Sequence, residues 1–173
     1  MAAAGGGDDE DRRGAVRRRA VGVVGVMAVA GMHVAVARDL PRLVSAAGVE
    51  FRWALEDGRL LHGCMRARTH GWVTVGFNTR PMLEGARLVM GRVVDGRAEL
   101  EVHRAEPPRH GRIAAADGGV RLVGSAQQAG FTRLCFVMPL GPIDRSDVAL
   151  VAGSLTHLVL AWSHERDFDH HSA

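Results

Sequence analysis

From residue 51 onward, turn signals divide the chain into short apolar segments, and the regular spacing of these turns constrains the fold most strongly. The signals are Asp57-Gly58, Asp95-Gly96 and Asp117-Gly118-Gly119, residue types that tolerate positive φ in hairpins. No helix of normal length competes after residue 50, although Asp39–Ala47 predicts one short helix with Pro41 in its first turn. The expected strands are Phe51–Leu55, Leu60–Ala67, Trp72–Phe77, Leu88–Val94, Ala98–Val102, Val120–Val123, Thr132–Val137 and Thr156–Trp162.

Strands spaced about 8–12 residues apart indicate an all-β fold, an antiparallel immunoglobulin-like β-sandwich of two packed sheets. The segment Gly71–Phe77 alternates as a sandwich strand does, with Trp72, Thr74 and Gly76 on one face and three apolar residues on the other. One face must belong to the core, and the other can face a second element. Because aromatic residues make up only 5% of the chain, the core must consist mainly of Val, Leu and Ala. Such a core leaves room for a bulky ligand to complete the packing.

The charge balance argues against nucleic-acid binding. All 22 basic residues are Arg, and the formal net charge is +3. Residues 38–173 carry 17 Arg against 15 acidic residues, a nearly balanced surface. The high isoelectric point follows from the lack of Lys and Tyr, because little else titrates at high pH.

The first 37 residues resemble an export signal. A basic region, Arg12–Arg19, precedes the apolar run Ala20–Met32, and a small-x-small site follows at Ala35-Val36-Ala37. This order predicts a signal peptide cleaved near Ala37 or, if uncleaved, a membrane-anchoring helix. We therefore expect an extracytoplasmic protein, periplasmic, secreted or membrane-anchored, with a leader over 1–37, a short extension over 38–48 and a sandwich over 49–173.

The chain has two cysteines, Cys64 and Cys135. An oxidising compartment permits a disulfide between them. Two separate, buried thiols on different strands are an equally good interpretation of the sequence alone.

Several motifs resemble the signature of DOMON domains. They are Gly71-Trp-Val-Thr-Val-Gly-Phe-Asn78, a loop with Pro81-Met82, Gly85-Ala86-Arg87-Leu-Val-Met-Gly91 and Val93-Val94-Asp95-Gly96. Phe136-Val-Met-Pro139-Leu140, Asp144 and Asp147, and Leu158–Trp162 agree with later parts of the pattern, so the resemblance covers about residues 49–171. DOMON domains are β-sandwiches outside the cytoplasm, and many bind haem b, as the cytochrome domain of cellobiose dehydrogenase does.

The resemblance implies non-covalent haem b with Met82 as the thioether ligand and His171 as the imidazole ligand, His170 being the neighbouring alternative. No Cys-x-x-Cys-His motif for covalent haem is present. The expected walls of the haem pocket are Trp72, Val75, Phe77, Leu83, Val89 and Met90.

Met/His ligation has a functional consequence, because it raises the reduction potential and fills both axial positions of the iron. The resemblance therefore implies a module that exchanges single electrons with an extracytoplasmic or membrane redox protein and has no catalytic site of its own. The alternative within the same fold is a non-redox module that binds a sugar or another small ligand.

Two positions depart from the family pattern: Arg87 replaces an Asp, and Met138 replaces an Arg before Pro-Leu. These changes can alter the pocket or the binding of haem propionates, for which Arg80 and Arg133 are candidate partners. Met138 can also offer a competing thioether, but its place within a strand favours core packing.

Two other chemistries have weaker support in the sequence. The tract His164–His171 contains imidazoles and carboxylates that suit Zn or Cu, but its spacing does not match a helical zinc motif. Gly153-Ser154-Leu155 lacks the pattern of a nucleophile elbow, so hydrolase chemistry is not indicated.

Overall fold

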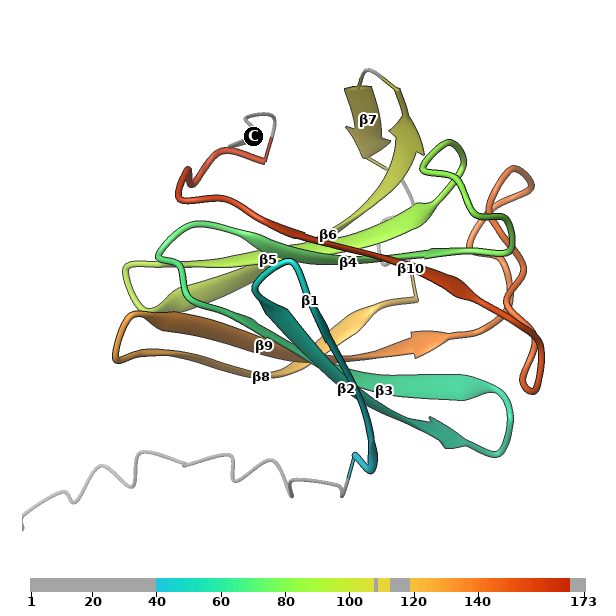
Figure 1. Cartoon of the computed structure of the whole chain (residues 1–173), viewed down its shortest axis with the longest axis horizontal. Coiled ribbons are helices and arrows are strands. Elements are labelled where there is room, and N and C mark those ends of the chain that lie inside the picture. The colour runs from blue at the N-terminus through green and yellow to red at the C-terminus, as the bar shows by residue number, and fades with distance from the viewer. Residues whose placement is uncertain (1–39, 108, 113–118, 169–173) are drawn as a thin grey trace, which may run out of the picture. The chain divides into compact units, whose positions relative to one another are not determined.

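The computed structural model describes residues 40–107, 109–112 and 119–168 (Figure 1). This part of the chain contains ten strands in two five-stranded antiparallel sheets, which confirms the predicted all-β sandwich. The first sheet has the order β1-β2-β3-β9-β8 and the second the order β10-β4-β5-β6-β7. The expected leader over 1–37 and its helix lie outside the described residues. Within them, no helix has the length and apolar character needed to cross a membrane.

The strand bounds follow the expected segments closely at β3, where prediction and structure coincide, and extend further at β6 and β8. The strands are β1 (Arg42–Ala46), β2 (Val49–Glu56), β3 (Leu60–Ala67), β4 (Val73–Asn78), β5 (Arg87–Val94), β6 (Arg97–Glu106), β7 (Arg109–Arg112), β8 (Arg121–Gln128), β9 (Phe131–Pro139) and β10 (His157–Trp162).

The short helix predicted over Asp39–Ala47 is wrong, because β1 occupies this segment and pairs with β2. Ala47 and Gly48 both have positive φ, 51° and 76°, and close a two-residue hairpin between the strands. The Trp162 indole donates a 2.9 Å hydrogen bond to the Ala47 carbonyl, which attaches this hairpin to the second sheet. Tertiary pairing thus overrides the local helical pattern.

The main core lies between the inner faces of the two sheets. Phe51 lies at its centre, stacked on Phe136 with ring centroids 6.3 Å apart and edge-on to Phe77 at 5.8 Å. Gly63 makes space for these rings, since a Cβ there would lie 2.8 Å from Phe51 and 2.9 Å from Phe136. Met138 is fully buried in this core, as its strand position favoured.

Cys64 and Cys135 form a disulfide. They lie directly opposite each other on the paired strands β3 and β9, 71 residues apart in sequence. The sequence left this pairing open, and the strand register resolves it.

Replacing both cysteines, Cys64→Ser with Cys135→Ser, should lower the free energy of unfolding by about 2–4 kcal/mol, because the unfolded chain loses its cross-link. Urea unfolding followed by circular dichroism measures the loss. Reduced wild-type protein is the matched control and should unfold at nearly the same urea concentration as the double variant. Equal midpoints for the oxidised wild type and the variant would contradict a stabilising disulfide.

A buried ion pair fixes the segment between β9 and β10 to the second sheet. The side chains of Arg87 and Asp147 are 0% and 1% exposed, and their nearest atoms, Nη2 and Oδ2, are 2.5 Å apart. Arg87 also donates to the carbonyls of Pro139, Gly141 and Val148 at 2.7–3.0 Å. The departure from the family pattern at position 87 therefore has a structural role at the end of the sandwich.

Arg87→Met should destabilise the fold by about 3–5 kcal/mol, because Asp147 is left charged and buried without its partner. The double variant Arg87→Met with Asp147→Leu should recover part of this loss, because it removes both charges. Chemical denaturation of the wild type, both single variants and the double variant gives the coupling free energy. A coupling near zero would show that the pair does not act as a unit.

Candidate functional site

The second sheet is apolar on its outer face as well as its inner face. All six residues of β4 are buried, with Val73, Val75 and Phe77 in the main core. Trp72, just before β4, belongs to a separate cluster on the opposite face. We call this set the outer cluster; it contains Trp72, Ala86, Leu88, Met90, Ala105 and Phe168, with Val159 and Ala161 packed against it.

The chain that follows β10 runs along one end of the outer cluster. Trp72 and Ser163 are joined by a backbone hydrogen bond of 3.0 Å, and the Trp72 amide donates to the Glu165 carbonyl at 3.2 Å. A Cβ at Gly71 would overlap the Ser163 and Glu165 carbonyls, so the glycine of the signature allows this close approach. Phe168, 5% exposed, ends this described segment inside the cluster.

The loop that carries Met82 lies at the other end of the outer cluster. It joins β4 to β5 and is tied to β6, because the Gly85 and Ala105 amides donate to the Ala105 and Ala86 carbonyls at 2.8 and 2.9 Å. Ala86 and Met90, both on the cluster, are four residues apart along an extended segment, about 13 Å. The cluster therefore connects the Met82 loop with the segment that leads to the C-terminal histidines.

Asn78 fixes the main chain of the Met82 loop. Its side chain is buried, and Nδ2 donates to the carbonyls of Met82 and Glu84 at 2.8 and 3.0 Å. Its Oδ1 accepts a 3.2 Å hydrogen bond from the Arg80 amide. The Met82 side chain itself is 44% exposed. The loop thus exposes a thioether, while the Asn78 side chain holds its backbone in place.

The structure divides the residues that were expected to line one pocket. Trp72 and Met90 lie together in the outer cluster, whereas Phe77 lies in the main core on the other side of the same sheet. Leu83 is 47% exposed beside Met82. Val75 and Val89 share the core with Phe77. His170 and His171 lie outside the described residues.

Of the two arginines considered for carboxylate binding, Arg80 belongs to the Met82 loop. Arg133 is exposed on β9 of the first sheet, opposite Arg66 of β3, so the fold does not bring it to the outer cluster. Arg92 was not predicted and does lie there, with its guanidinium carbon 4.5 Å from the centre of the Phe168 ring. Alternation along β5 could have predicted this position, because Arg92 lies on the same face as Leu88 and Met90.

His103 is a second residue that the sequence reasoning missed. It lies on β6, buried to 4% exposure, with Nε2 3.0 Å from Glu101 and its ring 6.0 Å from Phe168. Only the full length of β6 shows that residues 99, 101, 103 and 105 share one face. A polar pair therefore borders the apolar cluster on the β6 side.

The region described by the structure contains no group of three or more His, Cys, Asp or Glu side chains placed to hold a metal ion. His164, from the terminal tract considered for Zn or Cu, packs edge-on against Trp162 with ring centroids 4.7 Å apart. The last three residues of that tract, Asp169, His170 and His171, lie outside the described chain.

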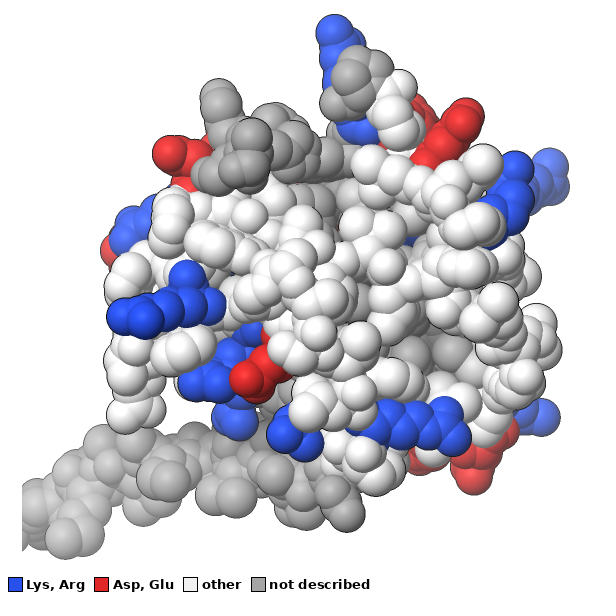
Figure 2. Space-filling view, viewed as in Figure 1, with Lys and Arg blue, Asp and Glu red and all other residues white. Residues whose placement is uncertain are grey.

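Charges are scattered on the face seen in Figure 2, which is mostly uncharged, with arginine and acidic side chains around it. Arg104 and Asp144 form one half-buried pair, with Nη2 2.8 Å from Oδ1. Hydrogen bonds from the hydroxyl and amide of Ser146, together with Arg104, lower the pKa of Asp144. Paired charges of this kind give the surface little field of a single sign.

No model of a known protein family matches this chain, and no curated protein does. Among solved structures, the chain is similar to the cytochrome b domain of pyranose dehydrogenase from Coprinopsis cinerea. The TM-score is 0.40 and the sequence identity 12%, over 65% of this chain and 76% of that chain. A TM-score of this size assigns neither family nor function.

Asn78→Ala should release the Met82 loop and lower the free energy of unfolding by about 1–3 kcal/mol, because two hydrogen bonds from the buried Asn78 side chain to the loop, each contributing about 0.5–1.5 kcal/mol, are lost. Hydrogen exchange at the amides of residues 82–86 should become faster than in the wild type. Glu84→Ala is the matched control, since it changes an exposed side chain of the same loop and keeps the carbonyl that Asn78 binds. Unchanged exchange in Asn78→Ala would show that the loop is held by other contacts.

Proposed function

We propose that this chain is an extracytoplasmic electron-transfer module that binds haem b non-covalently, with Met82 and His171 as axial ligands. The observation that carries the proposal is the outer cluster, an apolar surface on a sheet face that sandwiches normally expose to water. The Met82 loop lies at one end of this surface, and Phe168 lies at the other, three residues before His171.

The residues present fit a porphyrin in their chemistry. Trp72, Leu88 and Met90, which are buried in the outer cluster, would offer apolar contact to the macrocycle, and Arg80 of the Met82 loop and Arg92 beside Phe168 are candidate cations for its carboxylates. A thioether and a neutral imidazole are both established axial ligands of haem iron. When bound, haem b would supply one-electron redox chemistry.

The chain's own part in this function is to position the sulfur and to exclude water. Asn78 fixes the Met82 backbone through two hydrogen bonds, so the thioether is presented from a defined place. The outer cluster keeps water from the face of β4 and β5. A dry environment and a Met ligand both favour the reduced state, and therefore a raised potential.

The disulfide supports the proposed location. Structural disulfides form and persist in oxidising compartments. The export signal expected over residues 1–37 would deliver the chain to such a compartment. An electron-transfer module there needs a redox protein, soluble or membrane-bound, as donor or acceptor. An uncleaved leader would hold the module at the membrane surface.

Visible absorption spectra of the purified protein, reconstituted with haem, test this function. The wild type should show a Soret band and, after dithionite reduction, sharp low-spin α and β bands. Met82→Ala and His171→Ala should each lose the low-spin bands, because one axial ligand is removed.

Leu83→Ala and His170→Ala are the matched controls, since each alters a direct neighbour of a proposed ligand, and both should keep the wild-type spectrum. Loss of the bands in His170→Ala in place of His171→Ala would transfer the ligand role to His170. Absence of a Soret band from the reconstituted wild type would refute haem binding and favour the non-redox ligand-binding module.

A further inference from the structure

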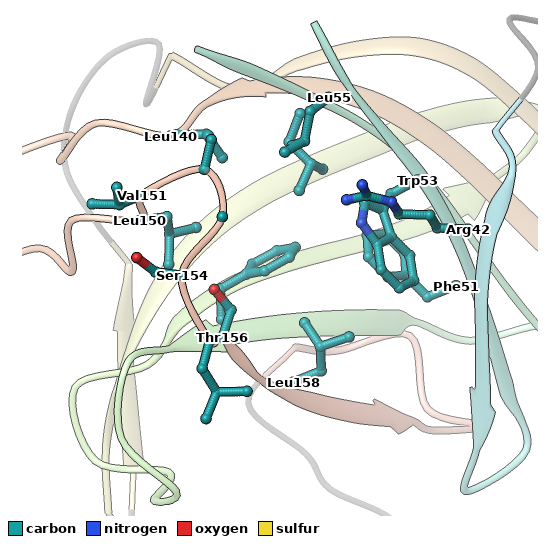
Figure 3. A pocket seen from close by; sticks show the side chains of 15 residues that line it. Arg42, Phe51, Trp53, Leu55, Leu140, Leu150, Val151, Ser154, Thr156 and Leu158 are labelled. Carbon is teal, nitrogen blue, oxygen red and sulfur yellow. The ribbon is translucent and has the colours of Figure 1, made fainter. Parts of the chain in front are cut away.

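The sandwich contains a second apolar feature, a pocket of about 300 Å³ between the inner faces of the two sheets. Phe51, Trp53 and Leu55 of β2 form one wall, and Phe77 and Leu158 of the second sheet form the opposite wall. Figure 3 shows the labelled side chains of β2 and Leu158 of β10 around the pocket, with Leu140 and Leu150 farther along it. Phe77 and Leu158 pack on the main core, so the second sheet separates this pocket from the outer cluster.

The walls of the pocket are aromatic and aliphatic. Trp53 is only partly buried and is stacked on Phe51, with ring centroids 5.4 Å apart and planes 9° from parallel. Six of the fifteen lining residues are leucines. An extended apolar group entering here would cover the partly buried side chains of Trp53, Leu55 and Leu158 at the edge of the core, as in many small-molecule sites.

A single charged side chain, Arg42, lines the pocket among the described residues. Arg42 is the cross-strand partner of Trp53, and Figure 3 shows its guanidinium beside the indole ring at the edge of the pocket. None of the described residues forms an ion pair with Arg42, whereas Arg66, Arg87, Arg92 and Arg104 are all paired. The pocket therefore combines apolar walls with one uncompensated positive charge at its edge.

Exposed apolar side chains surround the pocket on the segment that leads into β10. Val151 is 61% exposed and Leu155 is 76% exposed, and both belong to the pocket lining. The hydroxyls of Ser154 and Thr156 lie on the same segment. A bound molecule would cover apolar surface that the chain otherwise leaves in water.

We propose that this pocket binds a medium-chain monocarboxylate, with the hydrocarbon chain between the two sheets and the carboxylate paired to Arg42. The guanidinium matches the planar carboxylate with two parallel hydrogen bonds. Among the residues that the structure describes, no acidic side chain lines the pocket, so a cationic amphiphile would find no partner there. A sugar would find too few hydrogen-bonding groups along these walls. This proposal goes beyond the electron-transfer function and is independent of haem.

Titration of decanoate into the full-length protein tests the proposal, with binding followed by isothermal calorimetry below the micelle concentration. Saturable one-to-one binding is expected. Arg42→Gln should weaken it by about fivefold, the effect of losing one exposed ion pair. Ser154→Phe should weaken it further by filling the space beside Thr156.

Arg52→Gln is the matched control, because Arg52 is an exposed neighbour of Trp53 that points away from the pocket. Its affinity for decanoate should equal that of the wild type. Decanol, with the same chain and no charge, should bind more weakly to the wild type and equally to the wild type and Arg42→Gln. Met82→Ala should bind decanoate as the wild type does, which keeps this result separate from the haem experiment.

Three outcomes would overturn the proposal: no saturable binding of decanoate, the same affinity in the wild type and Arg42→Gln, or an equal fall in Arg42→Gln and Arg52→Gln. Equal affinities for decanol and decanoate in the wild type would remove the role given to the carboxylate and overturn it as well.

Discussion

Burial of β4 on both faces is the constraint on which the rest of the structure depends. Successive side chains of a strand point to opposite faces, so Gly71–Asn78 must satisfy two apolar environments at once. Its inward residues are Val and Phe, which pack in the main core. Its outward residues include Thr74 and Gly76, which are small and leave space for the outer cluster above the strand. At Gly76 a Cβ would lie 2.6 Å from Leu88 and 2.9 Å from Val159, so a larger residue would displace the cluster. One strand thus contributes to two apolar regions, which lie on opposite faces of the sheet and are separated by it.

Polar side chains organise the segments that these apolar regions cannot hold. Asn78 and Arg87 lie at the same end of the second sheet, one fixing the Met82 loop and the other fixing the segment after β9. Both are nearly inaccessible to water, and both donate to main-chain carbonyls of the segments that they hold. The two loops have different roles. The loop that Asn78 holds carries the proposed sulfur ligand, and the segment that Arg87 holds closes the pocket beside Leu140 and Leu150.

Much of the fold was predictable because β4 and its neighbours show period-two alternation with Asp-Gly turns between them. The hairpin at Ala47-Gly48 escaped prediction, since Ala carries no turn signal although its φ is 51° here. β7 escaped as well, because four residues give too little pattern. At the candidate site, Met82 and Trp72 were predicted from the resemblance to DOMON domains. His103 is recognisable only when the register of β5 and β6 is known, and Arg92 was missed although alternation along β5 indicates its face. Phe77 was assigned to the same pocket as Trp72, although alternation alone places the two on opposite faces.

The disulfide gives the chain the covalent form of a lasso, with a closed ring from Cys64 to Cys135 and two open ends. Asn78, Met82 and the β5 and β6 parts of the outer cluster belong to the ring, whereas Phe168 belongs to an open end. The two sides of the cluster therefore have unequal attachment. Because the chain has no further cysteines, only noncovalent contacts, such as that of Arg92 with the Phe168 ring, hold the open end against the ring at the outer cluster.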